Sequence, residues 1–225
     1  MTTTQTQLAP PGVCTYCGAE PGSAHLCTEC GRIQPVAQGT DYFAFLDLPR
    51  NLRIDESELE KTFYALSRQF HPDYFMNASA SEQQASVERS SMLNDAYRAL
   101  RDRVARAKYL LSLYGYKEAE KKAPPDLLEE IFELNMQIEE LKAAKKMADD
   151  EEVAEARAAL EDALRSLEGK MAKIDERLYS LFEEWDRALE SAQEDPKKSA
   201  LDGMSELLSH RSYIHNLVRD IKEEL

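Results

Sequence analysis

The sequence has no apolar run that approaches the about 20 residues needed to span a bilayer, which excludes an ordinary membrane-spanning protein. It is also poor in chain-breaking residues, with 8 glycines and 9 prolines in 225 residues, and most of the glycines precede residue 40. The opening MTTTQTQLAPPG lacks the basic and apolar regions of a secretory signal and the arginines of a mitochondrial transit peptide. We therefore expect a cytoplasmic protein.

Positive charge is scarce as well. The chain has 28 Lys and Arg against 42 Asp and Glu, which gives a formal net charge of −14. Proteins that bind nucleic acid neutralise phosphates with clustered Lys and Arg, so this charge argues against nucleic acid as the main partner. After residue 39 the sequence consists largely of helix formers, which predicts an all-α fold.

Composition divides the chain into three predicted parts. Residues 1–39 contain all four cysteines and little periodicity, and the Thr/Gln-rich residues 1–8 are expected to be disordered. Residues 40–117 carry short, aromatic-rich helical patterns. The basic hinge KEAEKKAPP, at 117–125, then leads into the heptad-like helices of residues 118–225.

The cysteines form two C-x-x-C pairs, Cys14 with Cys17 and Cys27 with Cys30. A glycine follows each pair, where a tight turn needs a positive φ. Four thiolates complete a tetrahedral zinc site, so the spacing predicts a four-cysteine zinc knuckle. Two disulfides are an alternative that a reducing cytoplasm disfavours, and an iron–sulfur cluster, which four cysteines can also hold, is another.

A zinc ion held by four thiolates has no open position for a substrate, so the predicted role of the metal is structural. The metal would supply folding free energy that so short a segment cannot draw from a hydrophobic core. His25, between the two pairs, is then not needed as a ligand, and we expect it on the surface. We also expect that no core of the following helices depends on residues 13–33.

The stretch QFHPDYF, at 69–75, lies between two predicted helices. Asp55, with Glu58 three residues later as in a capping box, predicts the start of the first helix, and Pro72 stops it after Phe70. A polar loop then precedes the second helix. The residues predicted to face inward are Leu59, Phe63, Leu66 and Phe70 in the first helix and Leu93, Ala96, Tyr97 and Leu100 in the second.

The tripeptide His71-Pro72-Asp73 admits three interpretations. A His/Asp pair can act as acid and base, but nothing nearby in the sequence offers a nucleophile, a metal or an enclosed pocket. A plain turn is a stronger alternative, since Pro and Asp both favour turns. The position of the tripeptide between two amphipathic helices favours the third interpretation, a recognition loop.

This helix–loop–helix resembles the J-domain, the module that stimulates ATP hydrolysis by DnaK-type chaperones. The segments DYFAFLDLP, LNDAYRAL and ARAKYLLSLYG further resemble the iron–sulfur co-chaperone branch of that family, HscB. The resemblance covers roughly residues 41–225, and it is closest over 41–116. An N-terminal double C-x-x-C knuckle is familiar from eukaryotic members and from some bacterial ones.

The resemblance implies a DnaK/HscA-type ATPase chaperone as a partner. It implies that His71 and Asp73 engage this chaperone and that Pro72 fixes the loop. Cations on the preceding helix of a J-domain meet an acidic surface of the chaperone. The clear candidates here are Lys61 and Arg68, which share one face of the first helix.

Heptad-like spacing predicts three long helices in the last part of the chain, at 126–141, at 151–192 and from 198 onward. Short connections between them predict an antiparallel three-helix bundle. The apolar seam residues are Leu127, Ile131, Leu134, Ile138 and Leu141 in the first helix, Val153, Ala156, Leu160, Leu167, Ile174, Leu178, Leu181 and Trp185 in the second, and Leu201, Met204, Leu208, Ile214, Leu217, Val218 and Ile221 in the third.

The first of these helices carries a second apolar row, Leu128, Phe132 and Met136, at about 100° from its seam. Such a row can pack against another helix, or it can stay exposed and bind a partner. The resemblance favours the partner, because this face of HscB holds the iron–sulfur scaffold protein, IscU. The scaffold-binding residues that we predict on this basis are Leu128, Phe132, Glu133, Met136, Glu140 and Tyr213.

The predicted function is that of a co-chaperone, not an enzyme. The protein would carry an IscU-like scaffold to a DnaK/HscA-type ATPase and stimulate ATP hydrolysis, which aids iron–sulfur cluster assembly and transfer. Two alternatives stay open: a J-domain protein for a different client, and a zinc-knuckle and coiled-coil adaptor without a chaperone role. Neither nucleic acid nor a membrane is an expected partner.

Overall fold

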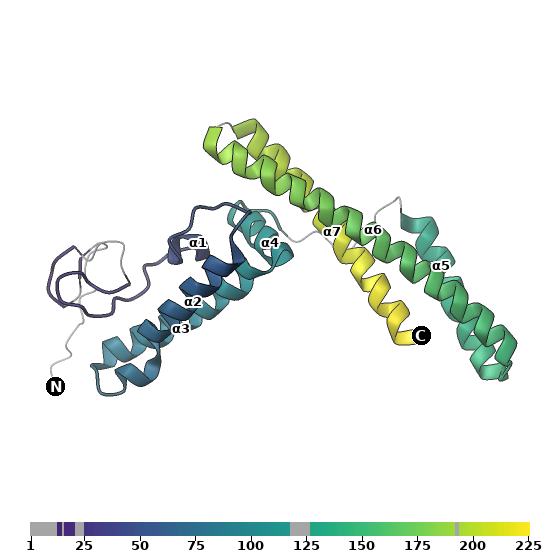
Figure 1. Cartoon of the computed structure of the whole chain (residues 1–225), viewed down its shortest axis with the longest axis horizontal. Helices are drawn as coiled ribbons and strands as arrows, with labels where there is room; N and C mark the ends of the chain where they lie inside the picture. Colours follow the sequence, from purple (N-terminus) through teal and green to yellow (C-terminus); the bar gives the residue numbers. More distant parts are fainter. Residues whose placement is uncertain (1–12, 15, 21–24, 118–126, 192–193) are drawn as a thin grey trace, which may run out of the picture. The chain divides into compact units, whose positions relative to one another are not determined.

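The computed structural model describes residues 13–14, 16–20, 25–117, 127–191 and 194–225 (Figure 1). Residues 1–8, which are predicted to be disordered, lie outside this part of the chain, and so does nearly all of the predicted hinge. Most of the described residues are helical. Leu26 and Ile33 form an isolated antiparallel β-bridge. The predicted all-α fold is confirmed.

The elements are, in chain order, α1 (Tyr42–Phe45), α2 (Glu56–Phe70), the 3₁₀ turn η1 (Pro72–Phe75), α3 (Ala80–Arg101), α4 (Arg103–Leu113), α5 (Leu128–Met147), α6 (Asp150–Ser191) and α7 (Glu194–Glu224). The chain divides into two compact units. The first unit combines Met1–Arg50 with Ile54–Arg106, and the second combines Asn51–Arg53 with Ala107–Leu225. None of the helices just named is long and apolar enough to cross a membrane.

The start of α2 follows from a side-chain cap at the predicted residue. The Asp55 carboxylate accepts the backbone N–H groups of Ser57 at 2.9 Å and Glu58 at 3.2 Å. These N–H groups have no partner inside the helix, so the cap stabilises its first turn. The predicted capping box does not form here, and the Glu58 carboxylate instead accepts a hydrogen bond from Lys61 Nζ at 2.6 Å.

The loop between α2 and α3 is short and structured. Because proline disfavours a helical residue before it, α2 ends at Phe70, and Pro72 opens the turn η1. The reciprocal cap expected for α2 occurs instead at the start of α3. There the Glu82 carboxylate accepts the Ser79 backbone N–H at 3.2 Å and the Ser79 hydroxyl at 2.6 Å.

The core of the first unit lies where α1 and α2 pack against α3. The carbonyl of Phe70 accepts the hydroxyls of Ser86 at 2.6 Å and Ser90 at 2.9 Å, which fixes the end of α2 to α3. All the residues predicted to face inward in α2 and α3 are buried or half-buried. Buried apolar residues of this core include Phe43, Phe45, Leu46, Leu59, Phe70, Ala85, Leu93, Ala96 and Leu100.

The second unit contains the predicted three-helix bundle of α5, α6 and α7. The long α6 packs against both α5 and α7. One buried cluster takes seam residues from all three helices: Leu127, Leu134, Leu141, Leu160, Leu167, Ile214, Leu217, Val218 and Ile221. At the α5–α6 turn, Ala148 is left-handed with φ 57°, and the Asp149 carboxylate caps α6 by accepting the N–H groups of Glu151 and Glu152, both at 3.1 Å.

The other end of α6 has a separate aromatic core. Trp185, the single tryptophan of the chain, is fully buried and meets the ring of Tyr114 edge-on, with 5.2 Å between ring centroids. One turn of this helix also binds the chain before α2. The Asp186 carboxylate accepts the backbone N–H groups of Leu52 at 2.7 Å and Arg53 at 3.0 Å. Trp185 is therefore a spectroscopic reporter for the second unit.

Candidate functional site

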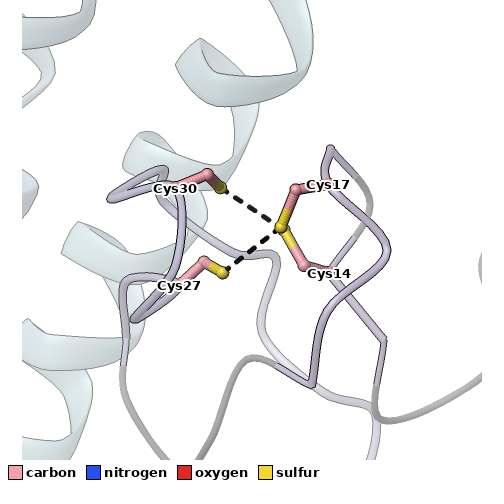
Figure 2. A group of neighbouring side chains, drawn as sticks. All are labelled: Cys14, Cys17, Cys27 and Cys30. Atoms are coloured by element: carbon pink, nitrogen blue, oxygen red, sulfur yellow. Dashed lines mark hydrogen bonds between the residues drawn. The ribbon is translucent and has the colours of Figure 1, made fainter.

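The four cysteines form one compact group of thiols (Figure 2). Their Sγ atoms all lie within 4.8 Å of one another. The Sγ–Sγ distance is 3.7 Å both for Cys14 and Cys30 and for Cys17 and Cys27, so each of these contacts joins one C-x-x-C pair to the other.

The turns after the cysteines explain how two short loops converge. Gly18 and Gly31 are left-handed, with φ 77° and 68°, a conformation that other residues rarely adopt. The Gly18 N–H donates to the Cys14 carbonyl at 3.0 Å, and the Gly31 N–H donates to the Cys27 carbonyl at 2.8 Å. Each glycine therefore closes a tight loop that presents two thiols on the same side.

This arrangement fits a single metal ion. A tetrahedral ion with Zn–S bonds of about 2.3 Å separates its sulfurs by about 3.8 Å, close to the two contacts above. A disulfide requires an S–S distance of about 2.05 Å, and all four cysteines are free thiols. The four thiols thus form a group that can hold a metal ion, with no position left for a further protein ligand.

The pKa values of the thiols show why a cation suits this group. Burial raises the pKa of Cys14, but hydrogen bonds from the backbone N–H groups of Cys17 and Tyr16 outweigh it and lower this pKa to about 6. The N–H of Ala19 acts to lower the pKa of Cys17, yet burial and the neighbouring thiols raise it to about 12. One thiol therefore ionises easily and opposes ionisation of its neighbours, whereas a bound cation allows all of them to be thiolates.

The expectation that His25 lies on the surface is wrong. Its ring is half-buried, and its centroid lies 5.0 Å from that of Phe45 in α1 and 4.9 Å from that of Phe70 at the end of α2. Burial, followed by the positive charge of Arg89, lowers the pKa of His25 to about 4. A neutral imidazole can therefore pack against these rings as part of the core.

Arg89 of α3 is the second residue that joins the knuckle to the helices. Its guanidinium is buried and donates to the carbonyl of Gln34 at 2.5 Å, to the carbonyl of Pro35 at 3.2 Å and to Nδ1 of His25 at 2.6 Å. Because His25 lies within residues 13–33 and contacts Arg89, Phe45 and Phe70, the expectation that the helical core is independent of this segment is also wrong. The buried Arg89 of α3 thus has its hydrogen-bond donors satisfied by the His25 ring and by backbone carbonyls of the segment that follows the cysteines.

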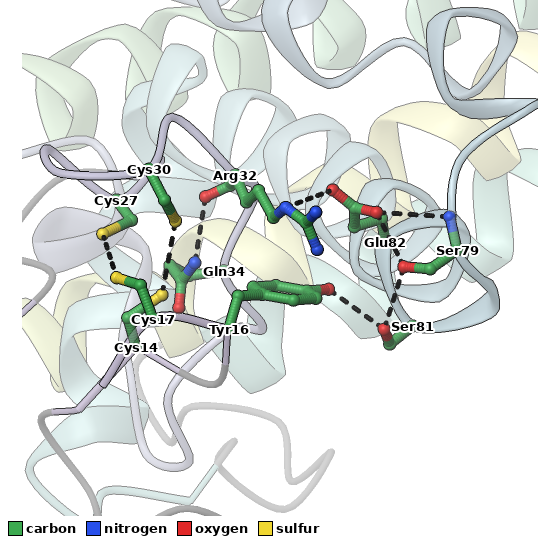
Figure 3. A network of polar contacts seen from close by, with 10 residues as sticks. All are labelled: Cys14, Tyr16, Cys17, Cys27, Cys30, Arg32, Gln34, Ser79, Ser81 and Glu82. Carbon is green, nitrogen blue, oxygen red and sulfur yellow. Dashed lines mark hydrogen bonds and ion pairs between the residues drawn. The ribbon is translucent and has the colours of Figure 1, made fainter. Parts of the chain in front are cut away.

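Two contacts at the edge of the knuckle reach the start of α3 (Figure 3). The Tyr16 hydroxyl lies 3.0 Å from the Ser81 hydroxyl, and Arg32 Nε lies 4.0 Å from Glu82 Oε1. The Arg32 guanidinium also lies over the Tyr16 ring, 4.9 Å from its centroid. These contacts are more exposed than the His25 cluster, so each contributes less to stability.

The HPD tripeptide forms an exposed turn at the end of α2. The side chains of His71 and Asp73 are 52% and 72% exposed, and His71 Nδ1 lies 3.5 Å from Asp73 Oδ2. The Asp73 N–H donates to the same Nδ1 at 3.4 Å, which is a long hydrogen bond. Pro72 supplies the first residue of η1, so the turn presents both polar side chains to solvent on a defined backbone.

The two predicted cations of α2 lie on its exposed surface but differ in their contacts. Lys61 pairs with Glu58, and the hydrogen bond from Lys61 to that carboxylate raises the pKa of Lys61. Arg68 lies in the last turn of α2, three residues before His71. Its positive charge is thus closer along the helix to the HPD turn, and it also stabilises the C-terminal end of α2.

The predicted second row of α5 is exposed. Leu128, Phe132 and Met136 are 55%, 65% and 48% exposed, while the seam of the same helix is buried at Leu134 and Leu141. The row therefore does not belong to the core of the bundle. An apolar strip of this kind on a surface helix is a candidate for partner binding.

The remaining predicted residues of this face have different settings. Glu133 and Glu140 are exposed on α5, beside the row. Tyr213 of α7 is half-buried and packs against the core cluster of the bundle. Tyr213 thus contributes to the core as well as to the surface, so a substitution there tests two properties at once.

Sequence reasoning passed over several exposed residues near the HPD turn. Tyr74 and Met76 are 73% and 68% exposed directly after the tripeptide, and Tyr64 is exposed on α2 between the two cations. For Tyr74 and Met76, the available signal was a large apolar side chain in a polar loop. For Tyr64, it was an aromatic side chain outside the inward-facing stripe of α2. Arg89 was detectable as well, because it occupies an inward position of α3, four residues before Leu93.

Comparison with known sequences identifies the helical hairpin. Residues 41–109 match the DnaJ domain family. The iron–sulfur cluster co-chaperone protein HscB of Mus musculus is 30% identical over 216 residues, an alignment that covers 93% of this chain and 81% of the mouse protein.

Solved structures of proteins named HscB resemble nearly the whole chain. The crystal structure of human co-chaperone protein HscB superimposes with a TM-score of 0.70 at 26% identity and covers 94% of this chain and 97% of the human one. The chaperone HscB from Vibrio cholerae gives a TM-score of 0.58 at 26% identity, with 82% of this chain and 96% of the other covered. The likeness extends beyond the DnaJ domain into the bundle.

Proposed function

The chain belongs to the HscB family of iron–sulfur cluster co-chaperones, and on that premise we propose that it acts as a co-chaperone, not as an enzyme. It binds an IscU-like scaffold protein on its bundle and brings it to a DnaK/HscA-type ATPase chaperone. It then stimulates ATP hydrolysis by the chaperone. In this way the protein aids the assembly and transfer of iron–sulfur clusters.

The observation that carries the proposal is the exposed HPD turn within a DnaJ domain. The turn is anchored by the buried Phe70, whose carbonyl accepts two hydroxyls of α3, yet it presents His71 and Asp73 to solvent. A turn that is already ordered loses little conformational entropy when it binds. This combination supports a recognition role for the tripeptide.

We assign the chaperone contact to five residues. His71 and Asp73 make the specific polar contacts, and Pro72 holds the turn that presents them. Lys61 and Arg68 lie seven residues apart, which is about two turns of α2, so they form one basic face. Charges of this kind mainly raise the association rate and set orientation, so they support the HPD contact without replacing it.

We assign the scaffold contact to the α5 face. Leu128, Phe132 and Met136 supply exposed apolar area, and Phe132 is the largest side chain among them. Glu133 and Glu140 act as charged residues at the edge of this contact, and Tyr213 adds an aromatic group from α7. Buried aromatic anchors dominate the free energy of most interfaces, whereas charges at the rim contribute less.

Carrying both contacts on one chain has a direct consequence. Once the scaffold is bound to the bundle and the chaperone to the HPD turn, the two proteins meet at an effective concentration set by the chain that joins them. No additional contact between scaffold and chaperone is needed for this gain. The co-chaperone therefore works as a connector that also activates the ATPase.

We further propose that the knuckle holds one structural zinc ion, because four thiolates suit zinc and leave no open coordination position. Cysteines that bind zinc as thiolates are typical of a reducing compartment, so we also propose a cytoplasmic location. The domains that we propose are the N-terminal segment with the knuckle at 1–39, the J-domain at 40–117 and the bundle at 118–225.

A paired ATPase assay tests the proposal. The rate of ATP hydrolysis by a DnaK/HscA-type chaperone is measured with this protein alone, with an IscU-like scaffold alone and with both together. We expect stimulation by the protein alone and a larger rate with both, because the ternary complex raises the effective concentration. The variant Phe132→Ala should retain the first effect and lose the second.

Two other results would redirect the proposal. Stimulation that is unaffected by the scaffold, together with no binding of scaffold to the bundle, points to a J-domain protein with a different client. An inactive wild-type protein in the same assay, with its metal bound, contradicts the co-chaperone function itself.

A further inference from the structure

Phe70 links the HPD turn to the rest of the first unit. It is the last residue of α2, is fully buried and directly precedes His71. Its carbonyl is held by Ser86 and Ser90, and its ring meets the ring of His25 edge-on, with 4.9 Å between centroids. Any change in how His25 packs therefore acts on the residue from which the HPD turn starts.

Arg89 makes the same link from α3. Its guanidinium lies 5.6 Å from the centroid of the Phe70 ring while it donates to His25 and to the carbonyls of Gln34 and Pro35. A buried cation that loses such acceptors is left strongly unsatisfied, so its side chain must move toward solvent. Phe70 would then lose packing on the side that faces the knuckle.

The cysteines control the segment that supplies these contacts. The Gln34 N–H donates to the His25 carbonyl at 3.1 Å, and the bridge between Leu26 and Ile33 continues this short hairpin. Cys27 lies inside the hairpin, two residues after His25, and its thiol lies 3.7 Å from that of Cys17. The thiols of the hairpin face those of the first C-x-x-C loop (Figure 2). A metal bound to all four would close the hairpin against that loop and so order the segment that presents His25.

We propose that His25 and Arg89 are positioning residues that couple the metal-bound knuckle to the HPD turn through Phe70. The knuckle is then more than a separate folded module, because it stabilises the conformation of the turn that contacts the chaperone. The functional part of this inference rests on the co-chaperone function proposed above. The structural part, coupling between the knuckle and residues 71–76, can be measured without any partner.

Hydrogen exchange of the full-length protein measures the coupling directly. The exchange rates of amides in residues 71–76 are compared in zinc-loaded protein, in chelator-treated protein and in the variants His25→Ala and Arg89→Lys. Loss of the metal should raise these rates about tenfold, because opening of the turn no longer has to break the His25 cluster. Each variant, with zinc bound, should reproduce a large part of that increase.

A double cycle separates coupling from general damage. If His25 transmits the effect, removing the metal from His25→Ala should raise the exchange of residues 71–76 less than it does in the wild type, because the link is already broken. Tyr16→Phe is the matched control: it removes the hydroxyl contact with Ser81 and leaves the His25 cluster intact. It should leave the exchange of the turn unchanged.

The ATPase assay supplies the functional readout. If only part of the population has the competent turn, the apparent affinity falls by that fraction while the saturated rate stays. Chelated protein and His25→Ala should therefore need about three- to tenfold more protein for half-maximal stimulation and reach nearly the wild-type maximum. Zinc should restore the chelated wild type but not His25→Ala.

Two results would overturn the inference. In the first, chelation increases exchange in residues 13–33 and leaves that of residues 71–76 unchanged. In the second, metal removal and His25→Ala act additively on the turn. A wild-type protein that fails to stimulate the ATPase would instead contradict the proposed function, and the exchange data would still decide whether the coupling exists.

Discussion

In the first unit, the HPD turn depends on polar and aromatic contacts that involve one or two residues each, whereas in the second unit the α5 row rests on a continuous apolar seam. Among the described residues of the first unit, the contacts of Phe70, His25 and Arg89 are each made once and are not repeated along a helix. The bundle instead buries similar residues along all three of its helices. We therefore expect a single substitution to shift the HPD turn, and we expect a surface substitution on α5 to leave the bundle intact.

Metal removal should produce the largest difference in stability between the first unit and the bundle. Removal of the proposed zinc ion should cost the knuckle its main source of folding free energy and Arg89 its acceptors. The unfolding free energy of the first unit should then fall by about 3 kcal/mol or more. The core cluster of the bundle contains no residue of the knuckle, so the bundle should unfold as before. Circular dichroism follows all helices, while Trp185 fluorescence follows the second unit.

The comparison fails if both probes shift together on chelation. Equal shifts would mean that the two units unfold as one cooperative structure. Restoring the original melting curve with one equivalent of zinc is the control for irreversible oxidation of the thiols.

A cavity in the seam should break the second unit instead. Leu134→Ala truncates a buried side chain of α5, and buried Leu→Ala substitutions cost about 3 kcal/mol. The Trp185 transition should move to lower temperature or lower denaturant concentration. ATPase stimulation in the absence of scaffold should persist under conditions where the bundle stays folded, because the HPD turn belongs to the first unit.

Phe132→Ala is the matched variant on the exposed side of the same helix. We expect it to weaken scaffold binding by about 2 kcal/mol, roughly 30-fold in Kd, because a large exposed aromatic is a typical hot spot. The unfolding free energy should change by less than about 0.5 kcal/mol. Leu128→Ala and Tyr213→Ala should have smaller effects on binding, and titration calorimetry measures all three.

If Phe132→Ala melts the bundle, the row belongs to the core after all. If the variant folds and binds the scaffold normally, the client surface lies elsewhere on the chain. Leu134→Ala, measured alongside, shows what loss of a seam residue does to the same helix.

The smallest expected effect is that of a charge at the edge of the α5 face. Glu140→Ala should weaken scaffold binding by about 0.5 kcal/mol at low salt, and the difference should vanish near about 1 M salt, because exposed charges are screened over about 3 Å there. The change should appear mainly in the association rate, which stopped-flow mixing measures. An effect that persists at high salt would place Glu140 inside the buried part of the contact.

The sequence predicted the bundle well because its physical cause is periodic. Seam residues such as Leu134, Leu160 and Ile214 recur at heptad spacing, and burial of such a stripe requires nothing beyond neighbouring helices with the same pattern. The second row of α5 could be located from the sequence, since its residues fall outside the seam, but its exposure was expected only from the resemblance to HscB. The thiol cluster followed from spacing alone, because two C-x-x-C loops need only converge.

The docking of the knuckle onto the helices was missed because it depends on single residues without a pattern. His25 was judged by its place between the cysteines, although its ring partners, Phe45 and Phe70, lie much further along the chain. Arg89 occupies an inward position of α3, but two of its acceptors are backbone carbonyls, which every residue possesses. Such contacts depend on the tertiary arrangement, which local propensity does not encode.

The break between α3 and α4 has a similar cause. The Asp102 carboxylate accepts the N–H of Ala105 at 2.7 Å and starts a new helix. Arg106 then donates from Nε to the carbonyl of Leu100 at 2.6 Å, which satisfies an acceptor at the end of α3. No motif in the sequence marks the buried Arg106 as the residue that satisfies this carbonyl.

The measurement that tests the co-chaperone assignment most directly is chaperone ATPase stimulation by His71→Gln, with scaffold binding and the melting curve recorded on the same sample. The HPD side chains are exposed, so the substitution should change stability by less than about 0.5 kcal/mol. His71→Gln should bind the scaffold as the wild type does and lose stimulation of the ATPase. Full stimulation by a folded His71→Gln protein would contradict the co-chaperone assignment.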